Sequence, residues 1–358
     1  GHAGSTLADT MIVASVDPET KDVAMLSLPR DLYVPIPKNG KNKINAAHAF
    51  GEMQKTGEGP NIAKEVVGEV LDIPVHNYVR VDFTGFKKAV DVLGGVTIDV
   101  ATPLSDSEYP CEKDERKACG FSVKAGTQLM NGATALKYAR CRKGNCGNDF
   151  GRAARQQEVL MAMREKALQM STLTNPAKLA GIIDTIGSHV RTDLSTEELT
   201  RLAEILKDVK SETVRSKVID GEEEKLVQVA NIAGASVVIP AGGEGKFGPI
   251  QDFAHSLFFD RHLVEENIPV TVVNASTKPL VFAALVERLK GYRYNIVGVE
   301  QAQSQTQSEL IDGTAGKGKY TRRYLEARYA VAAKEDASRG EGIILVVGDD
   351  TVTKTGDR

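Results

Sequence analysis

The chain has 358 residues, of which 41% are hydrophobic and 26% charged, and these proportions are typical of ordinary globular folds. Its formal net charge of −3 argues against a general nucleic-acid binder, because such proteins need a basic excess to displace counterions from phosphates. The length favours two domains. No stretch reaches the ~18 apolar residues of a membrane span, and residues 1–10 lack a signal-peptide core. We therefore expect that any membrane anchor has been removed from this chain.

The first predicted element is a β-hairpin. Two apolar, β-prone runs, 11–16 and 23–28, are separated by a polar and turn-rich insert. If the turn is centred between Glu19 and Thr20, cross-strand pairing places Asp9 opposite Arg30 at the open end. The sequence therefore predicts that two opposite charges meet just beyond the hairpin.

The following segments alternate between helical and extended patterns. Helices are predicted at 61–71, 83–93, 132–140 and about 152–170, strands at 76–82, 95–100 and 236–239, and a further helical piece at 253–259. Residues 101–125 are expected to be irregular, and 143–151 to form a glycine- and asparagine-rich loop. This alternation predicts an α/β or α+β layered domain.

A second periodic unit begins near residue 268. Its predicted elements are strands at 268–273, 294–299 and 342–348 and helices at 278–290 and about 320–334, with a flexible polar loop at 301–307. They describe a small βαβαβ-like domain. We place the two domains at residues 1–262 and 266–352.

The four cysteines form two close pairs, Cys111 with Cys119 and Cys141 with Cys146. Zinc sites favour C-x2-C spacings with histidines nearby, and this chain has neither. Local disulfides are the better interpretation, although four cysteines allow three pairings, because closing a short loop costs the least entropy. Disulfides would place the protein outside the cytoplasm.

Basic residues are concentrated between positions 137 and 155. This window contains six basic residues and one acid, Asp149, so its net charge is +5 although that of the whole chain is −3. The basic residues are Lys137, Arg140, Arg142, Lys143, Arg152 and Arg155. Charged runs are usually solvated helix faces. Here, however, most are arginines, whose planar fork suits phosphate oxygens. The helical spacing of Arg152, Arg155 and Gln156 predicts that these side chains share one face at a helix N-terminus, which attracts anions.

Five motifs in this order resemble the LytR-CpsA-Psr family. They are Leu7-Ala-Asp-Thr-Met11, Leu28-Pro-Arg-Asp31, Lys43-Ile-Asn45, Ala135-Leu-Lys-Tyr-Ala-Arg-Cys-Arg142 and Asp149-Phe-Gly-Arg-Ala-Ala-Arg-Gln-Gln157. The resemblance covers about 5–260, and about 268–350 is similar to the LytR C-terminal domain. It implies a central mixed β-sheet flanked by helices, followed by the small βαβαβ domain.

The resemblance also implies an activity. Family members transfer a glycopolymer from a polyprenyl-diphosphate carrier to a cell-wall acceptor, peptidoglycan or a surface protein, at the outer face of the membrane with Mg²⁺. By motif, the diphosphate-binding positions are Arg30, Arg140, Arg142, Arg152 and Gln156. Asp9 falls on a metal-ligand position, and Cys141 with Cys146 would brace the loop between the arginines.

For the catalytic step we expect Arg30 and Arg142 to stabilise phosphoryl charge and Asp149 to act as general base. The family's upstream Gly-x-Asp-x-Arg pattern does not precede Ala8. Either the chain starts too late to include it, or the metal is bound differently. A diphosphate hydrolase and a non-catalytic glycan-binding or regulatory module are the alternative functions.

Two glycine-rich segments resemble nucleotide-binding motifs. Residues 243–248 fit G-x-G-x-x-G but are flanked by prolines and lack a following βαβ unit. Residues 313–319 nearly match a phosphate-binding loop, but Tyr320 occupies the Ser/Thr position and no convincing strand precedes the segment. We expect neither to bind a nucleotide.

Overall fold

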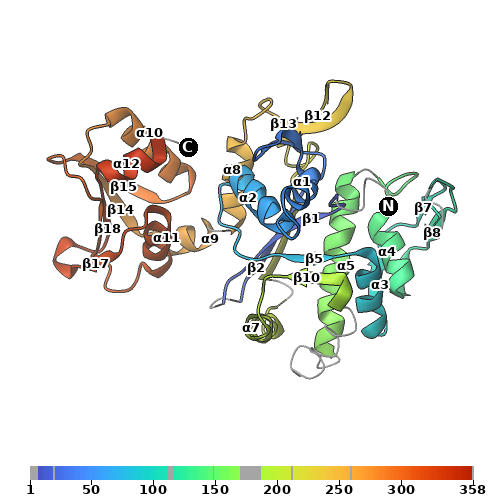
Figure 1. The fold of residues 1–358 in the computed structure, drawn as a ribbon. Coiled ribbons are helices and arrows are strands. Elements are labelled where there is room, and N and C mark those ends of the chain that lie inside the picture. The colour runs from blue at the N-terminus through green and yellow to red at the C-terminus, as the bar shows by residue number, and fades with distance from the viewer. Residues whose placement is uncertain are drawn as a thin grey trace. The chain divides into compact units, whose positions relative to one another are not determined.

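The structure is a computed structural model that describes residues 7–18, 21–111, 116–147, 149–169, 187–210, 213–258 and 260–356; for Asp149, Ser188, Asp260, Arg261 and 353–356 only the backbone is described. The chain forms two compact units, residues 1–250 and 251–358, and the colour bar of Figure 1 locates these residues along the ribbon. Among the helices described, none is both long and apolar enough to cross a membrane.

The N-terminal hairpin forms as predicted. Strands β1 (Met11–Val16) and β2 (Val23–Leu28) pair antiparallel, with Met11 opposite Leu28. Two positions beyond that pair, Arg30 and Asp9 form an ion pair of 2.7 Å, which confirms the predicted meeting of charges. A distant strand, β11 (Val214–Val218), joins the other edge of β2 in parallel. Strand β2 is thus the central strand of this sheet, and all of its residues are buried.

The remaining elements of the first unit alternate helices with short strand pairs. In chain order they are β3 (Tyr33–Ile36), β4 (Gly40–Lys43), η1 (Ile44–Ala46), α1 (Ala47–Gln54), α2 (Gly59–Leu71), β5 (Val79–Val81), α3 (Phe83–Val92), β6 (Val96–Val100), β7 (Leu104–Asp106), β8 (Phe121–Val123), β9 (Gly126–Met130), α4 (Gly132–Arg140), α5 (Asp149–Gln169), η2 (Gly187–His189), β10 (Val190–Thr192), α7 (Thr196–Lys207), β12 (Val227–Ile232) and β13 (Ala235–Pro240). Helix α8 (Gly248–Phe258) begins in the first unit and continues into the second. The predicted mixed α/β class is confirmed, with the strands distributed over several small sheets.

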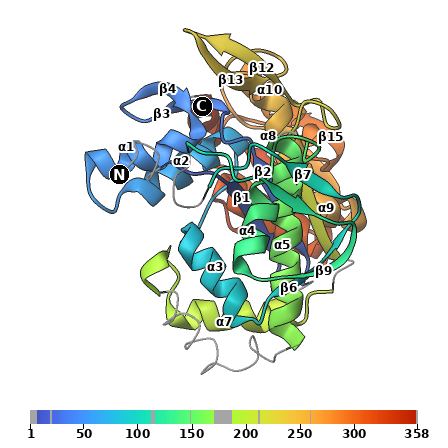
Figure 2. The same cartoon turned by 90° about the vertical axis from the view of Figure 1, so that its right-hand side faces the viewer.

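The helix pair α4 and α5 carries the arginine-rich motifs. Asn131 caps α4 by accepting a hydrogen bond from the Thr134 N–H. The apolar side of α4 packs with α5 and β6 around a core that includes Tyr138 and Val159. Figure 2 shows the two helices side by side. Helix α5 begins at Asp149, three residues before the predicted start, because Gly151 is accommodated in its first turn rather than in the loop.

The second unit is a small α/β domain built on one five-stranded sheet. Its strands lie in the order β15 (Asn295–Gln301), β14 (Pro269–Asn274), β18 (Ile343–Val347), β16 (Glu309–Asp312) and β17 (Ala333–Glu335), and its other elements are α9 (Asp260–Glu266), α10 (Pro279–Gly291), α11 (Lys319–Tyr329), η4 (Ala337–Arg339) and α12 (Asp349–Gly356). One hydrophobic cluster joins α10, α11 and the sheet.

Two details of this unit differ from the prediction. Strand β16 was missed, and the helix expected to reach residue 334 ends at Tyr329. Ala330 takes a left-handed conformation there, with φ of 53°, which terminates the helix. The chain then pairs as β17 alongside β16.

Candidate functional site

A pocket of about 330 Å³ opens in the first unit where the β1–β2 hairpin ends. Four of the predicted site residues line it, namely Asp9, Arg30, Arg152 and Gln156. The other walls come from β2, β11, the β12–β13 hairpin and the first turns of α5. Segments far apart in the sequence therefore bring these four side chains to one cavity.

Arg30 lies between two carboxylates on one side of this pocket. Its Nη1 donates to Asp9 Oδ1 at 2.7 Å, and its Nε lies 3.9 Å from Asp31 Oδ2. Asp31 Oδ1 in turn lies 2.9 Å from Lys43 Nζ. Arg30 Nε is buried and has no hydrogen-bond partner within the described part of the chain. Two acids on the wall of the pocket thus orient the guanidinium.

Helix α5 supplies another part of the pocket wall. Phe150, Arg152, Ala153 and Gln156 line it from the first two turns. The Arg152 side chain is largely enclosed, since the residue is 8% exposed. Gln156 Nε2 donates to the Ala139 carbonyl of α4 at 3.2 Å. Backbone N–H groups at a helix N-terminus favour anions, so this side of the pocket suits a phosphate.

Arg155 does not share this face, and that part of the sequence prediction is wrong. Its Nε donates to Tyr138 O at 3.1 Å, its Nη1 to Cys146 O at 2.8 Å, and its Nη2 to Cys141 O. Burial lowers the pKa of the guanidinium below its ordinary value. The C-terminal end of α4 lies against this side of α5 and draws Arg155 away from the pocket.

Arg140 and Arg142 lie outside the residues that line the pocket. The Arg140 guanidinium stacks on the Phe83 ring, 4.2 Å from its centroid. Arg142 is exposed, and its guanidinium has no ion pair or hydrogen bond within the described ranges. Asp149 is the first residue of α5, but its side chain lies outside the described atoms.

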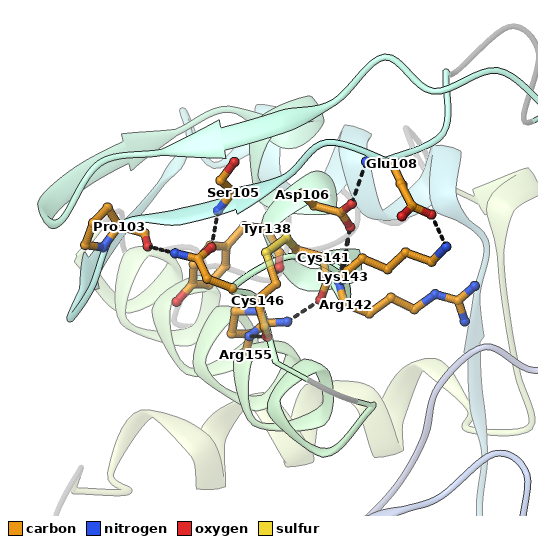
Figure 3. Close-up of a disulfide and its surroundings, with 11 residues drawn as sticks. Pro103, Ser105, Asp106, Glu108, Tyr138, Cys141, Arg142, Lys143, Cys146 and Arg155 are labelled. Atoms are coloured by element: carbon orange, nitrogen blue, oxygen red, sulfur yellow. Dashed lines mark hydrogen bonds and ion pairs between the residues drawn. A yellow bond between two sulfur atoms is a disulfide. The ribbon is translucent and has the colours of Figure 1, made fainter.

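Both local disulfides are present, as predicted. Cys111 pairs with Cys119 and Cys141 with Cys146. The second one closes the loop between α4 and α5 and is drawn in Figure 3, where the Arg155 side chain lies beneath it and Arg142 extends away from it. The brace expected between the arginine-bearing segments therefore exists.

Several pocket residues escaped the sequence analysis. Asp31 stands in the Leu28–Asp31 motif, and its position beside Arg30 was the signal that could have identified it. Glu222 also lines the pocket, at a turn where Asp220 Oδ1 accepts three backbone N–H groups. Gln157 Nε2 donates to Ser27 Oγ at 2.9 Å and so joins α5 to β2 beneath the site. No local sequence pattern indicates that contact.

Comparison with known proteins identifies the family. The model of the LytR_cpsA_psr family matches residues 2–238. This chain belongs to that family. A second model, the LytR cell envelope-related transcriptional attenuator, matches residues 267–351. Both expectations from the five motifs and the C-terminal periodicity are confirmed.

Several relatives carry names that describe transfer. The chain is 36% identical over 195 residues to the polyisoprenyl-teichoic acid--peptidoglycan teichoic acid transferase TagU of Oceanobacillus iheyensis, covering 54% of this chain and 56% of that protein. It is 35% identical to TagV of Bacillus subtilis, covering 60% and 52%. The regulatory protein MsrR of Staphylococcus aureus is 36% identical, covering 51% and 50%. The chain thus spans about half the length of the curated relatives that it matches.

Solved structures show the same fold over a larger share of the chain. The crystal structure of B. subtilis TagV superposes with a TM-score of 0.54 at 28% identity, covering 70% of this chain and 89% of that one. The structure of TagT bound to LIIa-WTA has the same TM-score and identity, covering 70% and 84%.

Proposed function

We propose that this chain transfers a glycopolymer from a polyprenyl-diphosphate carrier to a cell-wall acceptor, either peptidoglycan or a surface protein. The observation that carries the proposal is the pocket that Asp9, Arg30, Arg152 and the N-terminal turns of α5 line together. Two arginines and a helix N-terminus match the charge of a diphosphate. The names of the TagU and TagV relatives support the same reaction class.

In this proposal the diphosphate lies between the hairpin end and α5. Arg30 and Arg152 contact its oxygens, and Gln156 contributes from the adjacent turn of α5. Arg140 and Arg142, which leave the end of α4 next to α5, approach the substrate from the pocket rim. Arginine is suited to this role because its planar fork can bind two phosphate oxygens at once.

The reaction is a phosphoryl substitution. A hydroxyl oxygen of the acceptor forms a bond to the phosphorus nearer the glycan, the bond from that phosphorus to the bridging oxygen breaks, and polyprenyl phosphate leaves with that oxygen. Arg30 and Arg142 stabilise the negative charge that spreads over the phosphoryl oxygens. Asp149, at the start of α5, takes the hydroxyl proton as general base.

A magnesium ion is part of the proposal. The hard carboxylate oxygens of Asp9 suit it, and Asp31 lies in the same pocket. No group of three or more potential metal-ligating side chains occurs within the described ranges. Asp9 would hold the ion, and Asp31 is a second hard donor in the same pocket. When bound, such an ion would neutralise phosphate charge.

We also propose that the chain acts at the outer face of the cytoplasmic membrane, tethered by a segment outside this sequence. The two disulfides support an oxidising compartment. The names of the relatives, which refer to teichoic acid and peptidoglycan, support a place in the cell envelope.

The test incubates the purified chain with Mg²⁺ and a polyprenyl-diphosphate glycan, with and without acceptor, and measures the transferred glycan. Arg142→Ala should slow transfer by roughly 100- to 1,000-fold, because it removes one charge-stabilising donor. Asp149→Ala should slow it by roughly 100- to 10,000-fold through loss of the base. Arg201→Ala, at an exposed position on α7, is the matched control and should keep the wild-type rate.

The two arms of the assay separate the competing functions. Release of polyprenyl phosphate that needs the acceptor supports transfer, whereas equal release without acceptor indicates a hydrolase. Binding of the glycan without any release indicates a non-catalytic module. Wild-type turnover in both variants contradicts the assignment of Arg142 and Asp149.

A further inference from the structure

The loop of residues 141–146, which joins α4 to α5, is held by charged groups on two sides. Arg155 contacts its carbonyl oxygens from below, and Asp106 contacts its N–H groups from above, as Figure 3 shows. Both side chains are nearly enclosed, since Arg155 is 9% and Asp106 2% exposed. Neither residue lines the pocket, so any effect on the site must come through the loop that they contact.

Arg155 caps the C-terminal end of α4. The last carbonyls of a helix have no partner within the helix. Tyr138 O and Cys141 O, from the last turn of α4 and its C-cap, both accept from this guanidinium, and Cys146 O at the far end of the loop accepts the third bond. One planar group thus joins the two ends of the loop.

Asp106, at the end of β7, holds the middle of the same loop. Its Oδ2 accepts from Lys143 N at 3.2 Å and from Arg142 N at 3.4 Å, while its Oδ1 accepts from Glu108 N at 3.0 Å. Two nearby contacts support the arrangement. Asn145 Oδ1 accepts from Ser105 N at 2.6 Å. Gly144 lies so close to β7 that an added Cβ would come within 2.1 Å of Ser105 O.

These contacts fix the backbone on both sides of Arg142 and leave its side chain exposed. The carbonyl before it, that of Cys141, is held by Arg155, and its own N–H is held by Asp106. A long side chain on a fixed backbone loses less freedom when it binds than one on a mobile loop. We propose that Arg155 and Asp106 are positioning residues that hold Arg142 at the proposed diphosphate site. This inference rests on the proposed function.

A purely structural role predicts a different result, and α5 contains the control that separates the two. Arg164, nine residues further along the same helix, donates through Nη2 to Leu206 O at 3.0 Å and also to Val209 O. It therefore caps the end of α7 as Arg155 caps the end of α4, and burial also lowers its pKa. Arg164→Lys removes a similar set of bonds away from the pocket.

The experiment compares Arg155→Lys, Asp106→Asn and Arg164→Lys in the transfer assay, with thermal unfolding to confirm that each variant folds. Lysine keeps the charge at 155 but cannot reach three separated carbonyls. Asparagine keeps one acceptor oxygen at 106 and loses the other. We expect kcat to fall roughly 10- to 100-fold in both, because small misplacements of a reacting group cost that much, with little change in KM. Arg164→Lys should keep the wild-type kcat.

A double-mutant cycle with Arg142→Ala decides between the roles. If Arg155 acts through Arg142, then Arg155→Lys should lower kcat by less than about three-fold in the Arg142→Ala background, because coupled residues are not additive. If Arg155→Lys lowers kcat in the Arg142→Ala background as much as in the wild type, or if Arg164→Lys lowers kcat equally, the positioning role is overturned and the proposed function stands. Wild-type kcat in Arg142→Ala overturns this inference together with the proposed role of Arg142. If Arg155→Lys does not fold, the same cycle is run with Asp106→Asn.

Discussion

Two glycine-containing, basic loops in this molecule each lead into the N-terminus of a helix. They differ in the group that lies at that N-terminus. In the first unit the residues 141–147 precede α5, whose first turns line a pocket with Arg30. In the second unit the loop 313–318 precedes α11 and nearly matches a phosphate-binding loop. Both sequences suggest an anion at the helix start.

In the second unit the anion at the start of α11 is a carboxylate of the chain itself, that of Glu266. Glu266 accepts from Tyr320 N at 2.7 Å and from Thr321 N at 2.8 Å, and also from the Thr321 hydroxyl. Within the loop, Asp312 Oδ1 accepts from Thr314 N at 2.8 Å. Strand β16 precedes the loop, contrary to the expectation from sequence. A phosphate would nevertheless have to displace a carboxylate that the fold supplies.

The comparison shows why a glycine-rich motif alone is weak evidence for phosphate binding. A helix N-terminus that the chain's own acid occupies serves stability, whereas one that faces a pocket with arginines can serve a ligand. The difference depends on residues remote in sequence, Glu266 in one case and Arg30 in the other.

Removing the arginine opposite α5 should abolish most activity. Arg30→Ala is expected to lower kcat/KM for transfer by roughly 100- to 1,000-fold, since one donor to the reacting phosphate is lost. Arg30→Lys should recover only part of the rate, because a point charge does not reproduce the planar fork. Transfer kinetics with a polyprenyl-diphosphate glycan measure both. Unchanged kcat/KM in Arg30→Ala would remove the pocket from the proposed function.

Removing the carboxylate that meets α11 should affect stability and not transfer. Glu266→Ala leaves two N–H groups of the first turn without their acceptor, and loss of such a cap costs about 1–2 kcal/mol. Denaturant unfolding measures the loss of stability, and hydrogen exchange of the α11 amides shows whether the loss is local to that helix. Glu265→Ala, at the exposed neighbouring position, is the control. A transfer rate as low as that of Arg30→Ala would break the comparison between the two loops.

The parts of the structure that sequence predicted well are those fixed by neighbours along the chain. The β1–β2 register follows from one turn, so the Asp9–Arg30 pair was predictable. Helix α4 has the predicted bounds because Asn131 caps it and its apolar spacing is regular. The two disulfides close the shortest available loops.

The parts that sequence missed depend on distant partners. Strand β11 forms because β2 offers a free edge from nearly two hundred residues earlier, and β16 forms because it pairs with β18. Helical spacing placed Arg155 beside Arg152, but only the position of α4 shows that three carbonyls draw it elsewhere. Glu222 reaches the pocket through the same long-range pairing of β11. Local patterns contain none of this information.

The start of α7 is a third case, and there we expect the smallest effect. The anion at this helix start is the carboxylate of Glu198, which belongs to the helix itself and is exposed to solvent. Glu198 Oε2 accepts from Ser195 N at 2.7 Å while Ser195 Oγ accepts from Glu198 N, forming a capping box. The bond from Ser195 N lowers the pKa of Glu198 below its usual 4.5. A carboxyl whose pKa is lowered by folding stabilises above its unfolded pKa and loses that contribution as pH falls through the folded value. Hydrogen-exchange protection of the α7 first turn should therefore exceed that of Glu198→Gln near pH 7, and the difference should shrink as the pH falls below 4.5 and through the lowered folded pKa. A difference that persists unchanged at low pH would show that the carboxylate charge does not stabilise this helix start.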